Sequence, residues 1–203
     1  MKKFLLATAL TGIAAMSAQA ASHAETVKVG VVLGLTGPLE SLAGPIAGGA
    51  EMALAEINDA GGILDGKMVE GIRADATCVD AAAGTAAAER LVTSDGVAAI
   101  FGAMCSGTTG AILTNVSMPN GILQISASAT SPGLSTQEDN GLFFRMAPSD
   151  ARQGEVMSEI IMERGIKDVA VTYTNNDYGS GLADSFQAAF EAAGGTVTLS
   201  VAH

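Results

Sequence analysis

Hydroxyl-bearing residues gather in three short segments of this sequence, each of which follows an apolar run. The segments are residues 35–44, 104–109 and 126–131. Ser106 opens a predicted helix, where free backbone N–H groups and the helix dipole favour a bound carboxylate. Ser128 and Thr130 offer carbonyl and hydroxyl oxygens that accept hydrogen bonds from an ammonium group. Together these residues predict a site for a small zwitterion, although each one taken singly is also typical of a helix cap or an ordinary loop.

Catalytic chemistry has few candidate residues. The sequence contains two histidines, His23 and His203, and neither is placed to serve a serine or cysteine nucleophile. No glycine-rich phosphate-binding motif is present, and zinc would lack its usual imidazole ligands. The acidic pair Asp75 and Asp80 suits helix caps and solvated turns better than acid–base catalysis. We therefore expect no enzyme activity, no metal site and no cofactor.

The first residues are typical of a secretory signal peptide. Lys2 and Lys3 precede an apolar stretch at 4–16, and small-x-small cleavage patterns follow at 18–20 and 22–24. The apolar stretch is too short to span a bilayer. We expect residues 1–24 to be removed and the mature chain to reside in the periplasm.

Two cysteines, Cys78 and Cys105, are the only ones in the sequence. An oxidising compartment favours pairing them, which would stabilise the fold by about 3.5 kcal/mol in the chain-entropy model. Two free buried thiols are the alternative.

Composition narrows the class of protein further. The 203 residues carry a net charge of −11, with 48% hydrophobic and 15% charged residues. Such a chain folds into a globular structure, and its acidic charge repels nucleic acid. No nucleic-acid partner is expected.

The elements that position the hydroxyl-rich segments alternate between strands and helices. The predicted strands read as continuous apolar runs, which indicates parallel strands buried on both faces and an α/β fold class. We predict strands or extended segments at 27–33, 67–74, 97–101, 122–125, 142–146, 169–173 and 196–201. We predict helices at 46–58, 81–93, 106–116, 150–164 and 179–193, with Asp80 and Ser106 as caps of the second and third.

A polar stretch divides the mature sequence into two predicted lobes. Lobe 1 comprises residues 25–146, with a hinge near 126–146, and lobe 2 comprises residues 147–203. Lobe 2 has only two helices and a small parallel sheet, whose edge at 197–201 is apolar. The second lobe is expected to be incomplete, as in a sequence that has been cut short.

Several motifs, taken in order, resemble the leucine/isoleucine/valine (branched-chain amino acid) binding proteins, which are type I periplasmic binding proteins. The resemblance runs over the whole mature chain. It is carried by residues 34–38 (GLTGP), 48–58 (GGAEMALAEIN), 61–63 (GGI), 75–78 (DATC), 102–106 (GAMCS), 126–132 (SASATSP) and 177–183 (DYGSGLA).

This resemblance implies two Rossmann-like lobes that close over a ligand. It implies that Ser106, Ser128, Ala129 and Thr130 hold the ligand's carboxylate and ammonium groups, and that Tyr178 closes over it from the second lobe. It also implies the disulfide already inferred. Members of the family with aliphatic specificity carry an aromatic residue where this chain has Leu42, which leaves the side-chain preference open.

The function implied is that of a monomeric substrate-binding protein that delivers a solute to an ABC permease in the inner membrane. The expected ligand is a branched-chain or other hydrophobic amino acid, followed by other small amino acids, amides and carboxylates. A ligand-sensing domain of the same fold that feeds a signalling partner is the alternative.

Overall fold

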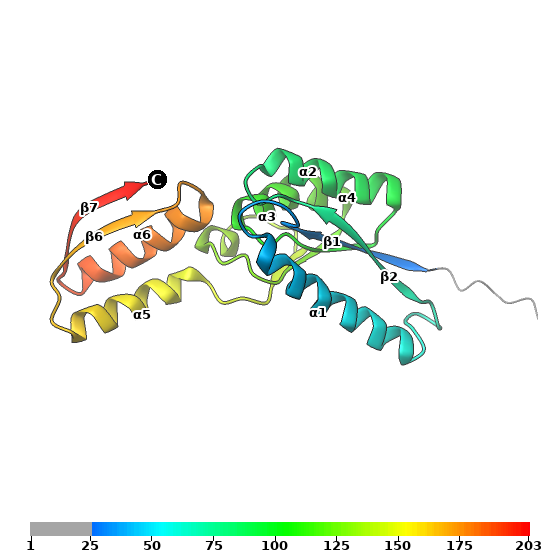
Figure 1. The fold of residues 1–203 in the computed structure, drawn as a ribbon, viewed down its shortest axis with the longest axis horizontal. Helices are drawn as coiled ribbons and strands as arrows, with labels where there is room; N and C mark the ends of the chain where they lie inside the picture. Colours follow the sequence, from blue (N-terminus) through cyan, green and yellow to red (C-terminus); the bar gives the residue numbers. More distant parts are fainter. Residues whose placement is uncertain (1–25) are drawn as a thin grey trace, which may run out of the picture.

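The computed structural model describes residues 26–203, which form two α/β bodies arranged side by side (Figure 1). One has a five-stranded parallel sheet in the order β2-β1-β3-β4-β5, and the other a two-stranded parallel sheet of β6 and β7. The strands are β1 (Val27–Leu33), β2 (Val69–Asp75), β3 (Ala99–Gly102), β4 (Leu123–Ser126), β5 (Phe143–Arg145), β6 (Asp168–Tyr173) and β7 (Thr196–Ala202). The helices are α1 (Glu40–Asp59), α2 (Ala81–Arg90), η1 (Leu91–Asp95), α3 (Ser106–Ile112), η2 (Leu113–Ser117), α4 (Met118–Asn120), η3 (Pro132–Ser135), α5 (Asp150–Glu163) and α6 (Asp177–Ala192).

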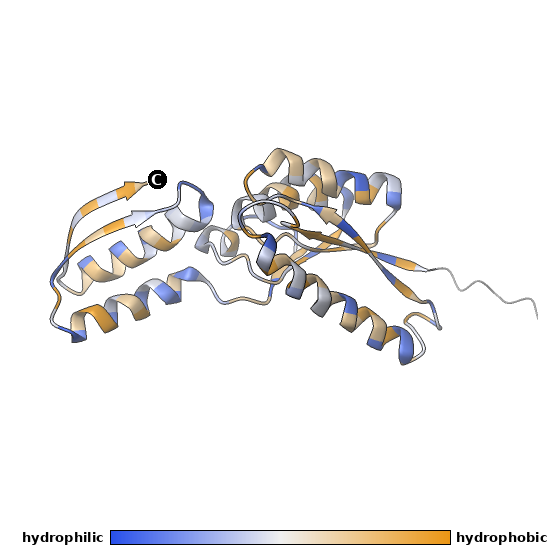
Figure 2. Cartoon of the chain, in the orientation of Figure 1, coloured by the Kyte–Doolittle hydropathy of each residue, from blue (hydrophilic) through white to orange (hydrophobic). Residues whose placement is uncertain are grey.

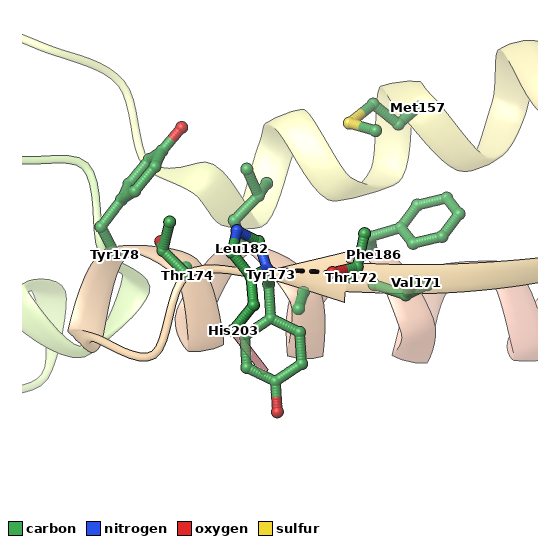
Figure 3. Close-up of a pocket in the computed structure, with 11 residues that line it drawn as sticks. Met157, Val171, Thr172, Tyr173, Thr174, Tyr178, Leu182, Phe186 and His203 are labelled. Carbon is green, nitrogen blue, oxygen red and sulfur yellow. Dashed lines mark hydrogen bonds between the residues drawn. The ribbon is translucent and has the colours of Figure 1, made fainter. Parts of the chain in front are cut away.

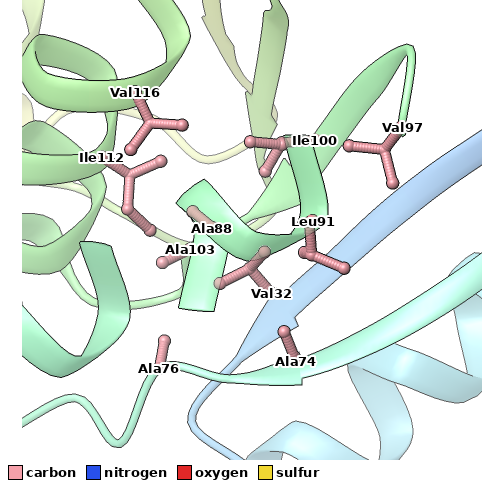
Figure 4. Packing of buried hydrophobic residues seen from close by; sticks show 10 residues of the cluster. All are labelled: Val32, Ala74, Ala76, Ala88, Leu91, Val97, Ile100, Ala103, Ile112 and Val116. Carbon is pink, nitrogen blue, oxygen red and sulfur yellow. The ribbon is translucent and has the colours of Figure 1, made fainter. Parts of the chain in front are cut away.

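Strand β1 is buried on both faces, which explains its unbroken apolar sequence. Val31 and Leu33 pack on one face against Ala43 and Ala47 of α1. Val32 points to the other face because successive side chains of a strand alternate. There it joins a cluster beneath α2, η1, α3 and η2, shown in Figure 4. Helices therefore cover both faces of this sheet, as the α/β prediction requires.

The second body is held together by α5 and α6. Gly154 of α5 lies so close to α6 that an added Cβ would stand 2.6 Å from the backbone nitrogen of Phe186. Phe186 stacks on Phe190 with ring centroids 5.4 Å apart, and both rings are buried. Hydrophobic residues run along the strands of both bodies (Figure 2).

The predicted strands agree with the structure to within two residues at each end. Helix α1 differs more, since it begins at Glu40 rather than 46 and contains Pro45. Proline inside a helix removes one backbone hydrogen bond. Burial of Ala43 and Ala47 against β1 offsets that loss. No helix within residues 26–203 has the length and apolar character needed to cross a membrane, and the predicted signal peptide at 1–24 lies outside the described residues.

Candidate functional site

A cavity of about 620 Å³ is lined by residues from both bodies. Its lining follows the carboxyl ends of six strands, β1 to β6, which is where open α/β sheets bind their ligands. One lining residue after each strand, in chain order, is Leu39, Val79, Ser106, Thr130, Asp150 and Asn176. Residues of all three hydroxyl-rich segments, 35–44, 104–109 and 126–131, therefore line one cavity at the carboxyl ends of the strands.

Ser106 lies at the start of α3, although it does not cap it. The prediction that Ser106 is the N-cap was wrong, because Cys105 has the extended backbone of a cap and Ser106 is already helical. Its side-chain oxygen instead accepts a hydrogen bond from the backbone N–H of Ser131, at 3.2 Å. Among the described residues no acceptor takes the proton of the Ser106 hydroxyl. That proton and the first-turn amides of α3 are donors of the kind that can hold an anion.

The segment after β4 supplies the other hydroxyls. Ser128 donates to the carbonyl of Met104 at 3.0 Å, which ties this loop to the one after β3. Thr130 lines the cavity, and its carbonyl accepts the backbone N–H of Asp150 at 2.9 Å. Ala129 is fully buried, and its amide donates to the Ser126 hydroxyl at 3.0 Å. Ala129 thus holds the segment in place, whereas Ser128 and Thr130 face the cavity.

Asp150 is a cavity residue that sequence reasoning missed. It is 2% exposed, it lines the cavity, and its Oδ2 has no hydrogen-bond partner among the described residues. An unpaired buried carboxylate is costly unless a cation or donor meets it. In the sequence, Asp150 directly follows the N-cap Ser149 and resembles the ordinary acidic residue of a first helical turn. What distinguishes Asp150 from such a residue is its burial, and the sequence pattern does not reveal that.

Asp75, dismissed as a catalytic acid, organises the loop after β1. Its carboxylate accepts the backbone N–H groups of Leu35, Thr36 and Thr77, and the hydroxyl of Thr36. Burial raises the pKa of the Asp75 carboxyl, but the hydrogen bonds from Thr36, Thr77 and Leu35 outweigh it and hold the pKa below its usual value. Asp75 therefore fastens the loops after β1 and β2 to each other.

The predicted disulfide between Cys78 and Cys105 is present, with Cα atoms 5.5 Å apart. It joins the loop after β2 to the residue that precedes Ser106. The predicted cap Asp80 is also confirmed, since its carboxylate accepts from the amides of Ala82 and Ala83 at 2.9 and 3.0 Å.

Tyr178 and Leu42 line the cavity from opposite bodies. Tyr178 lies in the first turn of α6, which begins two residues earlier than predicted. The side chain of Asn176 caps this helix, because its Oδ1 accepts the backbone N–H of Gly179 at 2.9 Å. Figure 3 shows Tyr178 at one end of a second cavity, of about 300 Å³, between α5, β6 and α6. Its hydroxyl points away from that of Tyr173 in this view. Five of the six predicted ligand residues thus line one cavity, and the sixth, Ala129, is buried and does not belong to the lining.

The profile of one protein family, described as periplasmic binding protein, matches residues 26–203. A Leu/Ile/Val-binding protein homolog from Brucella melitensis is 34% identical over 170 residues, which is 83% of this chain and 45% of that protein. A leucine-, isoleucine-, valine-, threonine- and alanine-binding protein from Pseudomonas aeruginosa is 33% identical over 96% of this chain and 50% of its own length. The chain spans about half the length of these curated relatives.

Solved structures show the same fold. The branched-chain amino acid transporter substrate binding protein of Streptococcus pneumoniae, in complex with isoleucine, superposes with a TM-score of 0.76 at 31% identity, over 88% of this chain and 50% of that one. A leucine binding protein from Thermotoga maritima superposes with a TM-score of 0.77 at 26% identity, over 87% of this chain and 49% of that one. These proteins are named for what they bind and not for a reaction, in agreement with the prediction of a non-enzymatic protein.

Proposed function

We propose that this chain, which belongs to the periplasmic binding protein family, is the substrate-binding protein of an ABC importer and captures a neutral amino acid between two lobes. The residues that favour this proposal lie around one cavity and carry complementary polarity. Ser106 and the start of α3 offer donors, while Asp150 offers an unpartnered acceptor. A zwitterion presents the matching pair of groups.

The carboxylate of the ligand is assigned to Ser106 and the first-turn amides of α3. Donors there gain from the helix dipole, which favours a negative charge at the N-terminus. Ser128 lies on the neighbouring loop and is anchored to the Met104 carbonyl. Its oxygen stays free to accept a further hydrogen bond.

The ammonium group is assigned to Thr130 and Asp150. These two residues are already linked, because the amide of Asp150 donates to the carbonyl of Thr130. Ser131 links them in turn to Ser106 through its own amide. The two poles of the ligand site thus belong to one hydrogen-bonded framework, and Asp150 is the single observation that carries the proposal.

Lobes 25–146 and 147–203 are assigned the two sides of the binding cleft, with the hinge near 126–146 and Tyr178 closing over the ligand. Residues 1–24 are assigned to a signal peptide. The proposed partner is an ABC permease in the inner membrane. A ligand drives closure only by binding the closed state more tightly than the open one. A monomer suffices, since the proposed site needs no residue from a second copy.

Calorimetric titration of the full protein, as its gene encodes it, tests this assignment. We expect leucine-like amino acids to bind and Ser106→Ala to weaken binding by about 1.5–3 kcal/mol, the value of a hydrogen bond to a charged group. Asp150→Asn should weaken leucine much more than 4-methylpentanoic acid, which has the same side chain and no ammonium group.

Asp168→Asn is the matched control, because Asp168 is exposed at the start of β6 and does not line the cavity. It should leave both affinities unchanged. Failure of every amino acid to bind the parent protein would refute the proposal, and so would an Asp150→Asn variant that binds leucine as the parent does.

A further inference from the structure

Arg145 is a half-buried arginine that makes several hydrogen bonds but no ion pair within residues 26–203. It is the last residue of β5, opposite Ser126 of β4, and beyond it the chain crosses to α5 of the other body (Figure 1). Withdrawing a guanidinium from water without an anion is costly unless other acceptors receive its N–H groups. The acceptors that Arg145 has therefore indicate what the residue does.

The acceptors of Arg145 are three oxygen atoms of the segment after β4 and of η3. Its Nη1 donates to the carbonyl of Ser131 at 2.8 Å and to that of Ala129 at 3.5 Å. Its Nη2 donates to the hydroxyl of Ser135 in η3. Thr130, which lines the cavity, lies between the two residues whose carbonyls are held. Arg145 thus holds the loop on both sides of a cavity residue without lining the cavity itself.

The backbone of Ser131 connects Arg145 to the proposed carboxylate site. The amide of Ser131 donates to the Ser106 hydroxyl oxygen at 3.2 Å, while its carbonyl accepts from Arg145. A hydroxyl that accepts one hydrogen bond keeps its own proton for another partner, and the direction of that proton depends on where the donor lies. A displaced Ser131 would therefore change the direction in which Ser106 offers its proton.

The beginning of the same loop is held by a different residue, Ser126, which is fully buried. Its hydroxyl accepts the amide of Ala129 at 3.0 Å and donates to the carbonyl of Ala103. These bonds join the loop after β4 to the loop after β3, but they do not reach Ser131. The end of the loop depends on β5 instead, through the side chain of Arg145.

A guanidinium suits this task better than an ammonium group. Its N–H groups lie in one plane with fixed directions, so that one side chain can serve several acceptors at once. Hydrogen bonds from charged donors are also stronger than those from neutral ones. Three acceptors from two segments of the chain meet the guanidinium of Arg145. A lysine would bring the same charge without the directions.

We propose that Arg145 is a positioning residue of the ligand site, which acts through Ser131 to orient the Ser106 hydroxyl. This inference rests on the proposed function, and it assigns part of the affinity to a residue that does not touch the ligand. With Arg145 in place, the loop holds its binding conformation before the ligand arrives. Without it, the ligand must order the loop, and that cost reduces affinity.

Calorimetric titration of leucine into the full protein, arranged as a double-mutant cycle, tests this role. Arg145→Ala should weaken leucine binding by about ten-fold, which corresponds to about 1.4 kcal/mol. In a Ser106→Ala background the same substitution should weaken it by no more than about two-fold, because the hydroxyl that Arg145 orients is already absent. A residue that only stabilises the fold would have equal effects in both backgrounds.

Two further variants complete the cycle. Arg145→Lys keeps the charge and loses the planar set of donors, so it should weaken leucine binding less than Arg145→Ala does. It replaces Arg145→Ala in the cycle if the alanine variant does not fold. Arg164→Ala is the matched control, because Arg164 is exposed at the end of α5 and does not line the cavity. It should leave the affinity unchanged.

The outcomes separate this inference from the proposed function. Leucine affinity that is unchanged in the Arg145 variants, or that falls equally in both backgrounds, overturns the positioning role and leaves the proposed function standing. A parent protein that binds no amino acid overturns both. Circular dichroism and thermal melting of each variant show whether the fold is intact.

Discussion

Asp75 and Asp150 show how alike two acidic residues look in a sequence and how differently they act. Both precede or begin a helical region, and the sequence pattern suggested caps and solvated turns for such residues. In the structure Asp75 accepts four hydrogen bonds from the loops around it, whereas the buried Oδ2 of Asp150 has no partner within residues 26–203. Hydroxyl residues were easier to locate, because each follows an apolar strand whose end the sequence marks clearly.

Replacing Asp75 with Asn tests whether its carboxylate stabilises the fold by holding the loops after β1 and β2 together. Because the folded pKa lies below the usual value near 3.9, Asp75 stabilises the fold above that pH and loses the effect as pH falls through the folded pKa. We expect Asp75→Asn to lower the free energy of unfolding by about 1–3 kcal/mol at pH 7 and by progressively less in acid. Urea unfolding at a series of pH values measures this.

Asp168→Asn provides the comparison, since it removes an equal charge from an exposed position of β6. A difference between the two variants that stays constant from pH 7 to acid would contradict the role given to Asp75.

At the scale of elements, all seven strands within the described residues fall on segments predicted as strands or extended, most of them apolar runs, and the helix starts were predicted less well. Helix α1 begins before Pro45 because its buried alanines pack on β1, and such tertiary packing is invisible in a local pattern. Helix α6 begins early because of the Asn176 cap. The sequence showed which loops share an edge of the sheet, but it could not show how closely α6 approaches η3.

That approach depends on Gly181 of α6. A Cβ there would stand 2.9 Å from Pro132 Cδ and 3.0 Å from Ser131 Oγ, both in the other body. Gly181→Ala should therefore oppose the approach of the two bodies and weaken ligand affinity by about 1–3 kcal/mol, the usual cost of overpacking. Calorimetric titration measures the affinity, and melting without ligand measures the fold.

Gly48→Ala is the matched variant, because Gly48 lies inside α1 with open space around it. It should leave affinity unchanged and raise stability slightly, since alanine favours helices. Equal affinities for Gly181→Ala and Gly48→Ala would show that the close approach at Gly181 has no part in binding.

At the scale of the whole molecule, the two bodies meet where α6 touches α3 and η3. A ligand that touches both should hold them together and stabilise the folded state. At a ligand concentration 100 times the dissociation constant, the free energy of unfolding should rise by about 2.7 kcal/mol. Thermal melting over a range of leucine concentrations measures the rise, and small-angle scattering measures compaction.

D-leucine offers a stereochemical control for that measurement, because it carries the same groups in a mirrored arrangement. Equal stabilisation by both enantiomers, or none by either, would contradict a shaped site between the lobes.

Residues around the cavity differ in how deeply they are built into the fold. Ser106 and Asp150 are 3% and 2% exposed, whereas Leu42 and Val79 are 53% and 72% exposed. Substitutions at exposed positions usually change stability by less than about 0.5 kcal/mol. Single substitutions at the exposed rim should therefore change the proposed ligand preference at little cost in stability. Substitutions of the buried Ser106 and Asp150, which are proposed to hold the groups that all α-amino acids share, should disturb the fold as well.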